Sequence, residues 1–520
     1  MGRLSVIFVM LAAIVACSRE DSLSDIEHGI KYGDDVGHEM IILGDRLDNP
    51  YTTENMTKAL QSLYPVKSRG ELQPTHLYVR FLPLEESDFE LLENLDLSDH
   101  PLDYQIIKDG DYYHDPSVDE DDATWQYAVV PHDYVFPDLH YEIIDKCFIK
   151  DDVISSRSGD IDWAEVERES YRLTGNEDMI VPQTRSGKSR PSGRITVADE
   201  KVNGGKPFGL AGVRVRCNSF VKFSHTYTDR DGYYSIPKEY SAKVRYRLVF
   251  KNEKGFAIGF NKLLVPASTA ALGKHSSEGL DYTVTSSSDR RLFTRSVVNN
   301  AAYDYISRCS SEDMAVSPPP ADLRIWLFKG MKASSAVMLH HGAVVERKNI
   351  NKFLGVFASI LKFFAPDITI GTDGKYEYSE IYSTVCHELA HASHFSQVGT
   401  EFWNRYILFI IKAFISSGGS SYGTGNETDA GYCAVGEMWA YYMESLMYKE
   451  RYGGNIPSFG STHWFAPQIF RALDQRGISR SDILAALTPD ITDVVKLKSR
   501  LISMHPEKGS MINQVFNRYR

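Results

Sequence analysis

The chain of 520 residues has few cysteines, no long apolar run after its first residues and no basic cluster. Its six cysteines include no Cys-x-x-Cys pair, which argues against a disulfide framework and against a thiolate zinc site. The richest later apolar segment, residues 406–415, is too short to span a membrane. The net charge of −12, with no basic stripe, argues against a nucleic-acid partner. What remains is a chain long enough for several globular domains.

The first residues have the pattern of an export signal. Arg3 precedes a short apolar run, Val6 to Val15, and the string IVAC that ends at Cys17 resembles the lipobox of bacterial lipoproteins. This resemblance implies cleavage before Cys17, lipid attachment to it, and an outer-membrane lipoprotein that faces the periplasm or the cell surface. An ordinary signal peptide cleaved elsewhere is the alternative. We therefore expect a signal peptide over residues 1–16 and a polar tether over residues 17–45.

Residues 46–182 are expected to form a small α+β domain. Periodicity predicts strands at His76–Phe81 and Trp125–Val130 and an acidic helix at Glu85–Leu95. From Glu85 to Asp122 there are fifteen acidic residues and one lysine, Lys108. Such runs usually form a solvated face. The alternative is a propeptide-like domain, or a substrate-selecting flap near a cationic cleft.

A basic segment rich in Ser and Gly, residues 183–193, marks a domain boundary. After it, strands are predicted at Val213–Arg216, Tyr233–Ile236 and Arg245–Phe250, with an Asp-Gly turn before the second. The strings GRITV, LAGVRV and TYTDRDGYYSIP resemble the carboxypeptidase regulatory-like module, a transthyretin-like β-sandwich. The resemblance implies a β-sandwich middle domain at residues 192–265 that acts as a spacer or a chaperoning platform.

The stretch Ile381–Val398 predicts an amphipathic helix, with Glu380 in its first turn. His387 and His391 are four residues apart, so their imidazoles lie on one face and can bind one metal ion. Glu388 lies beside that face, where a general base for a metal-activated water is needed. HExxH is the pattern of zinc peptidases, so the expected cofactor is Zn²⁺.

A catalytic zinc needs a third protein ligand and an open fourth position. The best candidate is Glu437, in the string GEMWAY on a helix that runs to about Glu450. With HExxH this string resembles the gluzincin clan, which implies that Glu437 completes a His, His, Glu site. Glu444, two turns further on the same helix face, and Asp429 are the alternative third ligands.

Two other zinc-peptidase clans fit less well. A metzincin needs Gly and His where this chain has His394 and Gln397. His394 shares the ligand face and is expected to lie beside a metal ligand or at the surface. An aspzincin needs Asp where the chain has Asn426.

Residues 290–520 are expected to form a zincin-like α+β catalytic domain. The pattern predicts a helix at Arg291–Tyr305 and strands at Leu323–Phe328, Ala336–Leu339 and Asp367–Ile370 before the HExxH helix. In zincins the strand before this helix is an edge that pairs with the substrate backbone. Asp367–Ile370 is the candidate. The expected fold is thus multidomain α+β, with a small α+β N-terminal domain, a β-sandwich middle domain and this C-terminal domain.

The sequence predicts an exported, membrane-anchored, zinc-dependent metallopeptidase that hydrolyses a peptide or protein substrate. Tyr441, Tyr442 and His463 are candidates, by position, for the donor that stabilises the oxyanion. Endopeptidase and exopeptidase activity both remain open. The alternative is a non-catalytic surface lipoprotein that uses the zincin scaffold for binding or adhesion. The presence of Glu388 favours the enzyme, since a degenerated site has no reason to keep its base.

Overall fold

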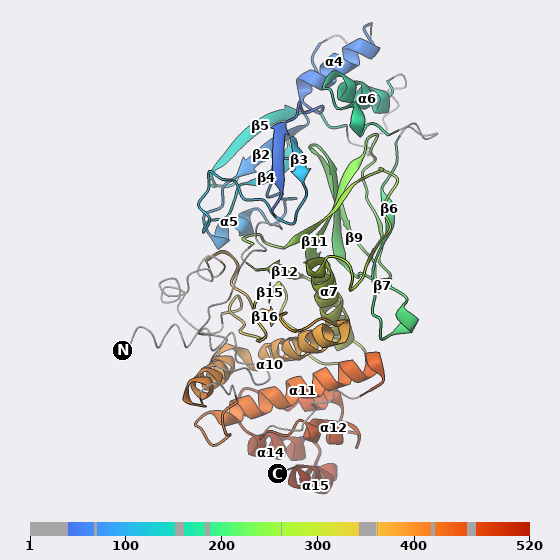
Figure 1. Cartoon of the computed structure of the whole chain (residues 1–520). Coiled ribbons are helices and arrows are strands. Elements are labelled where there is room, and N and C mark those ends of the chain that lie inside the picture. Colours follow the sequence, from blue (N-terminus) through green and yellow to red (C-terminus); the bar gives the residue numbers. More distant parts are fainter. Residues whose placement is uncertain are drawn as a thin grey trace.

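The computed structural model describes residues 40–66, 70–150, 161–181, 188–261, 263–342, 360, 362–417, 422–454 and 464–519. These residues form a mixed α+β structure, which confirms the general fold class expected from the sequence. In Figure 1 the N-terminal strands and helices lie at one end, two middle sheets follow, and the long C-terminal helices lie at the other end.

Residues 40–181, here called the N-terminal layer, contain two small antiparallel sheets. In the larger sheet β2 lies between β4 and β5, and in the smaller one β1 pairs with β3. The helix expected at Glu85–Leu95 ends early, because Leu92 leaves it and is buried in the core beneath the larger sheet. The elements are β1 (Ile42–Arg46), α4 (Thr53–Leu63), β2 (His76–Phe81), α5 (Glu86–Leu91), β3 (Tyr104–Lys108), β4 (Gln126–Pro131), β5 (Tyr141–Cys147), α6 (Trp163–Leu173) and the 3₁₀ helix η1 (Glu177–Met179).

Two sheets form the middle of the chain. The smaller has the order β10-β6-β14, with β7 beside β6; the larger has the order β16-β15-β12-β11-β8-β9, with β13 beside β11. The strands are β6 (Ser192–Val197), β7 (Phe208–Gly209), β8 (Val213–Ser219), β9 (Lys222–Tyr227), β10 (Tyr233–Ser235), β11 (Val244–Asn252), β12 (Phe256–Phe260), β13 (Thr269–His275), β14 (Tyr282–Val284), β15 (Leu323–Phe328) and β16 (Ile368–Gly371).

The larger sheet continues across the boundary expected between the middle and catalytic domains. β12 pairs in parallel with β15, and β15 pairs in parallel with β16. Buried residues of both middle sheets belong to the same core as those of α7 and of the long helices α10 and α11. The sheet and the helices that carry the predicted site are therefore packed as one structure.

A capping carboxylate and two glycines set where the long helices of the C-terminal part begin, bend and end. Glu380 accepts hydrogen bonds from the backbone N–H groups of Tyr376 and Glu377 at the start of α10. Gly399, with a φ of 76°, bends α10 near its middle, and Gly453, with a φ of 72°, ends α11. The helices are α7 (Arg290–Cys309), α10 (Tyr378–Ser417), α11 (Ala430–Tyr452), α12 (Gln468–Asp474), α13 (Arg480–Ala485), α14 (Val494–Met504) and α15 (Gly509–Arg518), and short 3₁₀ helices are η2 (Asn203–Gly205) and η3 (Pro506–Lys508).

The sequence predicts that Asp367–Ile370 is the edge strand before the HExxH helix, and β16 does stand at the end of the order of the large sheet. β16 is the last named strand of the sheet and leads into α10, but its outer side is already paired. Ser335 and Thr369 exchange two backbone hydrogen bonds of 2.9 and 2.8 Å, and the Met338 N–H donates to the carbonyl of Asp367. The predicted strand Ala336–Leu339 is therefore an irregular segment, and Ser335 just before it forms the isolated bridge on the side of β16 where a substrate backbone was expected.

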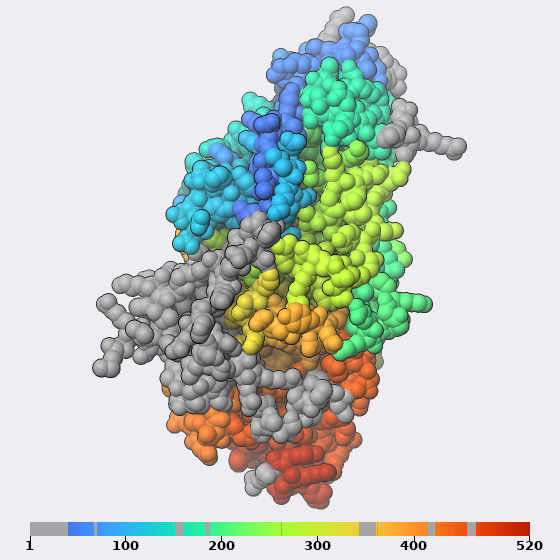
Figure 2. All heavy atoms as spheres, in the orientation of Figure 1, coloured from blue at the N-terminus to red at the C-terminus, as the bar shows by residue number. Residues whose placement is uncertain are grey.

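Only part of the acidic run is a solvated face: six of its acids are exposed, whereas others pair with cations of the rest of the chain. The large sheet has an apolar face and a face on which Arg214 and Arg216 of β8 lie beside Arg245 and Arg247 of β11, with Arg216 directly opposite Arg247. The N-terminal layer lies against the part of the chain that holds the middle sheets (Figure 2), and Asp96 and Asp109 of the acidic run pair with arginines of this face. The pairs on this face, with their N to O distances, are Asp96 with Arg214 at 3.5 Å, Asp109 with Arg245 at 3.4 Å and Asp109 with Arg247 at 2.7 Å. The run also pairs with cations of other elements: Asp111 with Arg295 at 2.7 Å, Glu86 with Arg324 at 2.6 Å and Asp122 with Lys362 at 2.7 Å.

Asp111→Asn is expected to lower the free energy of unfolding by about 3 kcal/mol, because it leaves a fully buried guanidinium, that of Arg295, without its carboxylate. The matched control is Asp178→Asn. Asp178 pairs with Lys274 at 2.9 Å but is largely exposed, so we expect a loss below about 1 kcal/mol. Urea unfolding of the two variants measures the difference, and equal losses would contradict the buried interface.

The cysteines and the apolar helices were the subject of two expectations from composition. The described cysteines are all buried free thiols: Cys147, Cys217, Cys309, Cys386 and Cys433. Among the described helices, none has both the length and the apolar character of a membrane span. Cys17 lies outside the described residues.

Candidate metal centre

α10 and α11 pack side by side and bring three side chains to one point (Figure 1). His387 and His391 come from successive turns of α10, and Glu437 comes from α11. One ligand atom from each residue lies within 4.8 Å of the others. Nε2 of His387 is 3.5 Å from Oε2 of Glu437, and Nε2 of His391 is 3.4 Å from Oε1. Ligand atoms around a tetrahedral zinc lie about 3.3 Å apart, so the spacing fits a bound ion.

The nitrogen and oxygen atoms that converge there lack hydrogen-bond partners. All three side chains are buried, and Nε2 of both histidines and Oε2 of Glu437 have no hydrogen-bond partner among the described residues. Buried polar atoms without partners are costly and uncommon. Two further buried carboxylates, Glu388 and Glu444, belong to the same region. A cation would satisfy the lone pairs and offset the negative charge, so these residues fit a metal ion.

Glu388 follows the first histidine and is buried with an unpartnered oxygen, Oε2. The pKa of the Glu388 carboxyl is raised to about 8, mainly because burial leaves a carboxylate poorly solvated; His387 lowers the pKa, and the negative charges of Glu437 and Glu444 raise it. A carboxyl group with a pKa near neutrality can both accept and return a proton.

Glu444 does not join the three ligand atoms. Its Oε2 lies 3.2 Å from Nδ1 of His387, the ring nitrogen opposite the candidate metal position. The Ser383 hydroxyl donates a hydrogen bond to the other oxygen of Glu444. Because its oxygen meets the other ring nitrogen of His387, Glu444 is not grouped with the three ligand atoms. It fixes the orientation and tautomer of His387, so that Nε2 is free for a metal.

Tyr406 is a site residue that the sequence analysis missed. Its hydroxyl donates a hydrogen bond of 2.6 Å to Oε1 of Glu437. The ring also lies against that of His391, with centroids 5.5 Å apart. The bend of α10 at Gly399 places Tyr406 here, and no local sequence pattern predicts such a contact.

The charge state of the two histidines differs because their surroundings differ. Burial lowers the pKa of His391, which keeps the imidazole neutral as a metal ligand must be. Burial acts in the same direction on His387, but the carboxylates of Glu437 and Glu444 reverse it and raise the pKa well above its usual value. A proton on His387 and a metal ion therefore compete for the same site.

The remaining candidates are distributed around the site. The Tyr441 ring lies against the His387 ring at 4.7 Å, and its hydroxyl is 3.4 Å from that of Tyr422. Tyr442 packs against Trp439 and Phe470 instead, which removes it from the oxyanion candidates. The candidate His463 lies outside the described residues.

Two other predicted residues lie away from the ligand atoms. Asp429 precedes α11 and faces Arg405, with N to O at 3.8 Å, and does not reach the three ligands. His394 is neither a surface residue nor a hydrogen-bonded neighbour of a ligand. It is fully buried against Phe402 and Trp403, and burial lowers its pKa to about 3.

Glu444→Ala is expected to weaken metal affinity by about 10–100-fold, because His387 loses the partner that orients it. Competition with a chromophoric chelator measures the dissociation constant. Asp429→Ala removes a carboxylate at the start of α11, away from His387, and should leave the affinity unchanged. Equal affinities for both variants would show that Glu444 does not act through His387.

Two imidazoles and one carboxylate form a donor set for transition metals rather than for calcium or magnesium, which prefer oxygen ligands. The arrangement can hold a divalent ion beside a proton-accepting carboxylate, that of Glu388. No protein-family model, no curated protein and no solved structure matches this chain, so the site's chemistry is inferred from its residues and their geometry.

Proposed function

We propose that the chain is a zinc-dependent metallopeptidase of the gluzincin type. One observation carries the proposal: three buried, unsatisfied ligand atoms of His387, His391 and Glu437 converge beside the buried, unpartnered carboxyl oxygen of Glu388. A structural zinc site uses four protein ligands, whereas a catalytic site uses three and keeps one position open. Three protein ligands and an adjacent base favour catalysis over a structural role.

When bound, zinc would supply Lewis-acid chemistry that polarises a scissile carbonyl and lowers the pKa of water. Oε2 of Glu388 accepts a proton from the attacking water and passes it to the amine that leaves. Burial raises the pKa of the Glu388 carboxyl, which helps it to hold the proton before the amine leaves. Glu444 and Tyr406 hold His387 and Glu437 in place throughout.

Tyr441 is the proposed donor to the oxyanion that develops on the carbonyl. The support for this role is that its ring lies against the ring of His387, with centroids 4.7 Å apart. Such donors are effective because they are oriented before the charge develops. His463 is kept as the second proposed donor from its sequence position.

Export and membrane attachment are part of the proposal. The IVAC string and the short apolar run before Cys17 support a lipid-anchored protein at the outer membrane. An anchored enzyme would act on a peptide or protein substrate in the periplasm or at the cell surface.

The test is hydrolysis of casein, an unfolded substrate, by the purified chain. We expect activity that a chelator removes and that stoichiometric Zn²⁺ restores. Activity that resists complete metal removal would contradict the metallopeptidase. A protein that binds zinc and casein but cleaves nothing would favour the binding or adhesion alternative.

A further inference from the structure

Solvent reaches the metal centre on the side of His387. The side chains of His391 and Glu437 are completely buried, whereas His387 is 6% exposed. Tyr441, whose ring centroid is 4.7 Å from that of His387, is exposed to the same extent. A peptide therefore approaches the ligand atoms from the side of His387 and Tyr441.

On this side a series of aromatic rings leads from the metal centre to the surface. The ring of Tyr441 is followed by that of Phe465, with centroids 5.8 Å apart, and Phe465 is followed by Trp464, at 5.5 Å. Tyr422 joins the series through Phe465, at 5.2 Å. Phe465 and Tyr422 are buried, but Trp464 is 37% exposed and is the most exposed tryptophan among the described residues. The series therefore ends in a large apolar ring that meets solvent.

Trp464 is held in one position although much of it meets solvent. Its indole N–H donates a hydrogen bond of 2.8 Å to the carbonyl of Tyr422. A Cβ on Gly425 would lie 2.5 Å from the nearest ring atom, so the indole packs directly on the backbone of this loop. Glu427 fixes the loop in turn, because its carboxylate accepts hydrogen bonds from the N–H groups of Thr424 and Gly425, at 2.8 and 2.9 Å. A rigid apolar ring in contact with water is well suited to bind another apolar group.

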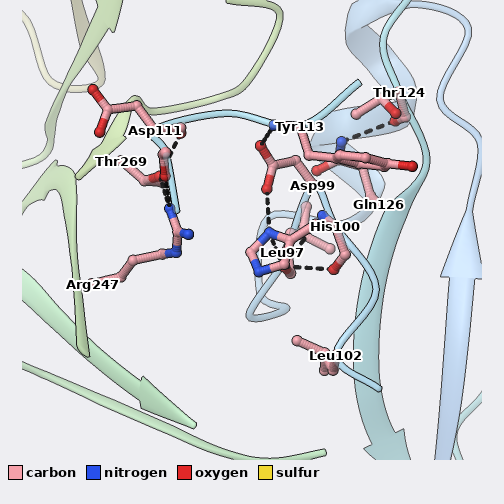
Figure 3. Close-up of polar contacts among 12 residues, drawn as sticks. Leu97, Asp99, His100, Leu102, Asp111, Tyr113, Thr124, Gln126, Arg247 and Thr269 are labelled. Atoms are coloured by element: carbon pink, nitrogen blue, oxygen red, sulfur yellow. Dashed lines mark hydrogen bonds and ion pairs between the residues drawn. The ribbon is translucent and has the colours of Figure 1, made fainter. Parts of the chain in front are cut away.

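The polar cluster between the N-terminal layer and the large sheet has a different character. In Figure 3 the Asp99 carboxylate accepts a hydrogen bond from the Tyr113 N–H and contacts the His100 ring, and Arg247 donates to Thr269. These groups satisfy one another and join the layer to the sheet, so the cluster has a structural role.

The spacing of the rings places Trp464 a short way along a bound peptide. Three steps between ring centroids, of 4.7, 5.8 and 5.5 Å, lead from His387 to Trp464. An extended peptide advances about 3.3 Å per residue, so a substrate with its scissile bond at the metal centre reaches Trp464 within about five residues.

We propose that Trp464 binds an aromatic or large aliphatic side chain of the peptide substrate, within about five residues of the scissile bond. This inference rests on the proposed metallopeptidase activity and specifies its substrate class. Aromatic rings favour offset or edge-to-face contacts with another ring, so aromatic side chains suit this surface best. Because the loop already holds Trp464 in place, little conformational entropy of the enzyme is lost on binding.

The cleavage sites in casein, mapped by mass spectrometry, test the preference first. We expect aromatic and large aliphatic residues to be enriched at one position within about five residues of the cleaved bonds. A synthetic peptide with such a site is then compared with the same peptide carrying alanine at that position. The kcat/KM of the aromatic peptide should be about tenfold higher. The difference should lie mainly in KM, because a contact remote from the reacting atoms is made equally in the ground state and the transition state.

Variants of Trp464 assign the preference to this ring. Trp464→Ala should bring the ratio of the two kcat/KM values close to one, and Trp464→Phe, which keeps a ring, should retain most of it. Both variants should keep their zinc, since Trp464 is not one of the three ligands. Tyr233→Ala is the matched control, because Tyr233 is an exposed ring of β10 in the smaller middle sheet, and it should leave the ratio unchanged. If Trp464→Ala cleaves neither peptide, Trp464→Leu replaces it, with an expected ratio between one and that of the unaltered chain.

Each result decides the inference. A ratio that falls in Trp464→Ala, or in Trp464→Leu in its place, and is kept in Tyr233→Ala would support it. Casein cleaved with no apolar preference would overturn this inference alone and leave the metallopeptidase intact, and so would an unchanged ratio in the Trp464 variant. Casein that is not cleaved at all by the zinc-loaded chain would overturn both.

Discussion

Glu388→Gln is expected to lower kcat/KM for peptide hydrolysis by about 10²–10⁴-fold. The amide has nearly the same shape as the carboxylate but cannot accept the proton of the attacking water. Because Glu388 is not one of the three ligands, the variant should keep its metal. Activity and metal content measured on one preparation therefore separate loss of the base from loss of the site.

The matched control is Glu380→Gln at the start of the same helix. The Glu380 carboxylate accepts hydrogen bonds from Tyr376 and Glu377, and a glutamine oxygen can accept them as well. This variant should keep full activity. A Glu388→Gln enzyme with unchanged kcat/KM would rule out Glu388 as the base, and loss of metal would show a structural role instead.

Removal of residues 40–181 is expected to leave the rest of the chain insoluble or inactive, not activated. The deletion would uncover Arg216, Arg247 and Arg295, which are buried beneath the N-terminal layer. It would also remove Glu167, the partner of the fully buried Lys222 at 2.7 Å. Charges that lose buried partners are each costly by about 3–5 kcal/mol, which together exceeds the stability of a typical domain.

A milder variant tests the same point without a deletion. Asp109→Asn combined with Asp111→Asn loosens the interface and should lower the unfolding midpoint without raising activity. A propeptide-like layer predicts the opposite, because a loosened inhibitor releases its cleft. A soluble truncated chain with higher activity than the full chain would contradict the structural role of the layer.

The parts of the site that depend on one helix could be predicted from the sequence. His387, Glu388 and His391 have positions set by the period of an α-helix, and the helix is supported by its apolar positions and by Glu380. Glu437 is on a second helix that ends at a glycine, and only the packing of α10 on α11 places it at the histidines. A periodic sequence pattern predicts that a helix forms, but it does not predict which other helix packs against it.

The acidic run illustrates a limit of composition. Fifteen acids in one segment suggest a solvated face, but some of them, such as Asp96 and Asp109, pair with arginines more than a hundred residues away. A signal was present: arginine alternates with apolar residues at Arg214 and Arg216, and again at Arg245 and Arg247. Alternation of this kind gives a strand one basic face, and a basic face on a central strand needs an acidic cover.

Contacts made by irregular segments could not be predicted. Ser335 pairs with Thr369 although Ala336–Leu339 does not form a regular strand, and this pairing closes the edge of β16. Tyr406 reaches Glu437 only because α10 bends at Gly399. Such contacts depend on turns whose geometry is set by the folded whole rather than by neighbouring residues.

The central claim is that His387, His391 and Glu437 bind one zinc ion. The most direct measurement is the metal content of the purified chain, after reconstitution with Zn²⁺ and removal of excess, compared with Glu437→Ala and Asp429→Ala. We predict about one zinc per chain, lost in Glu437→Ala and retained in Asp429→Ala. Zinc retained at full stoichiometry in Glu437→Ala, or no zinc in the unaltered chain, would contradict the claim.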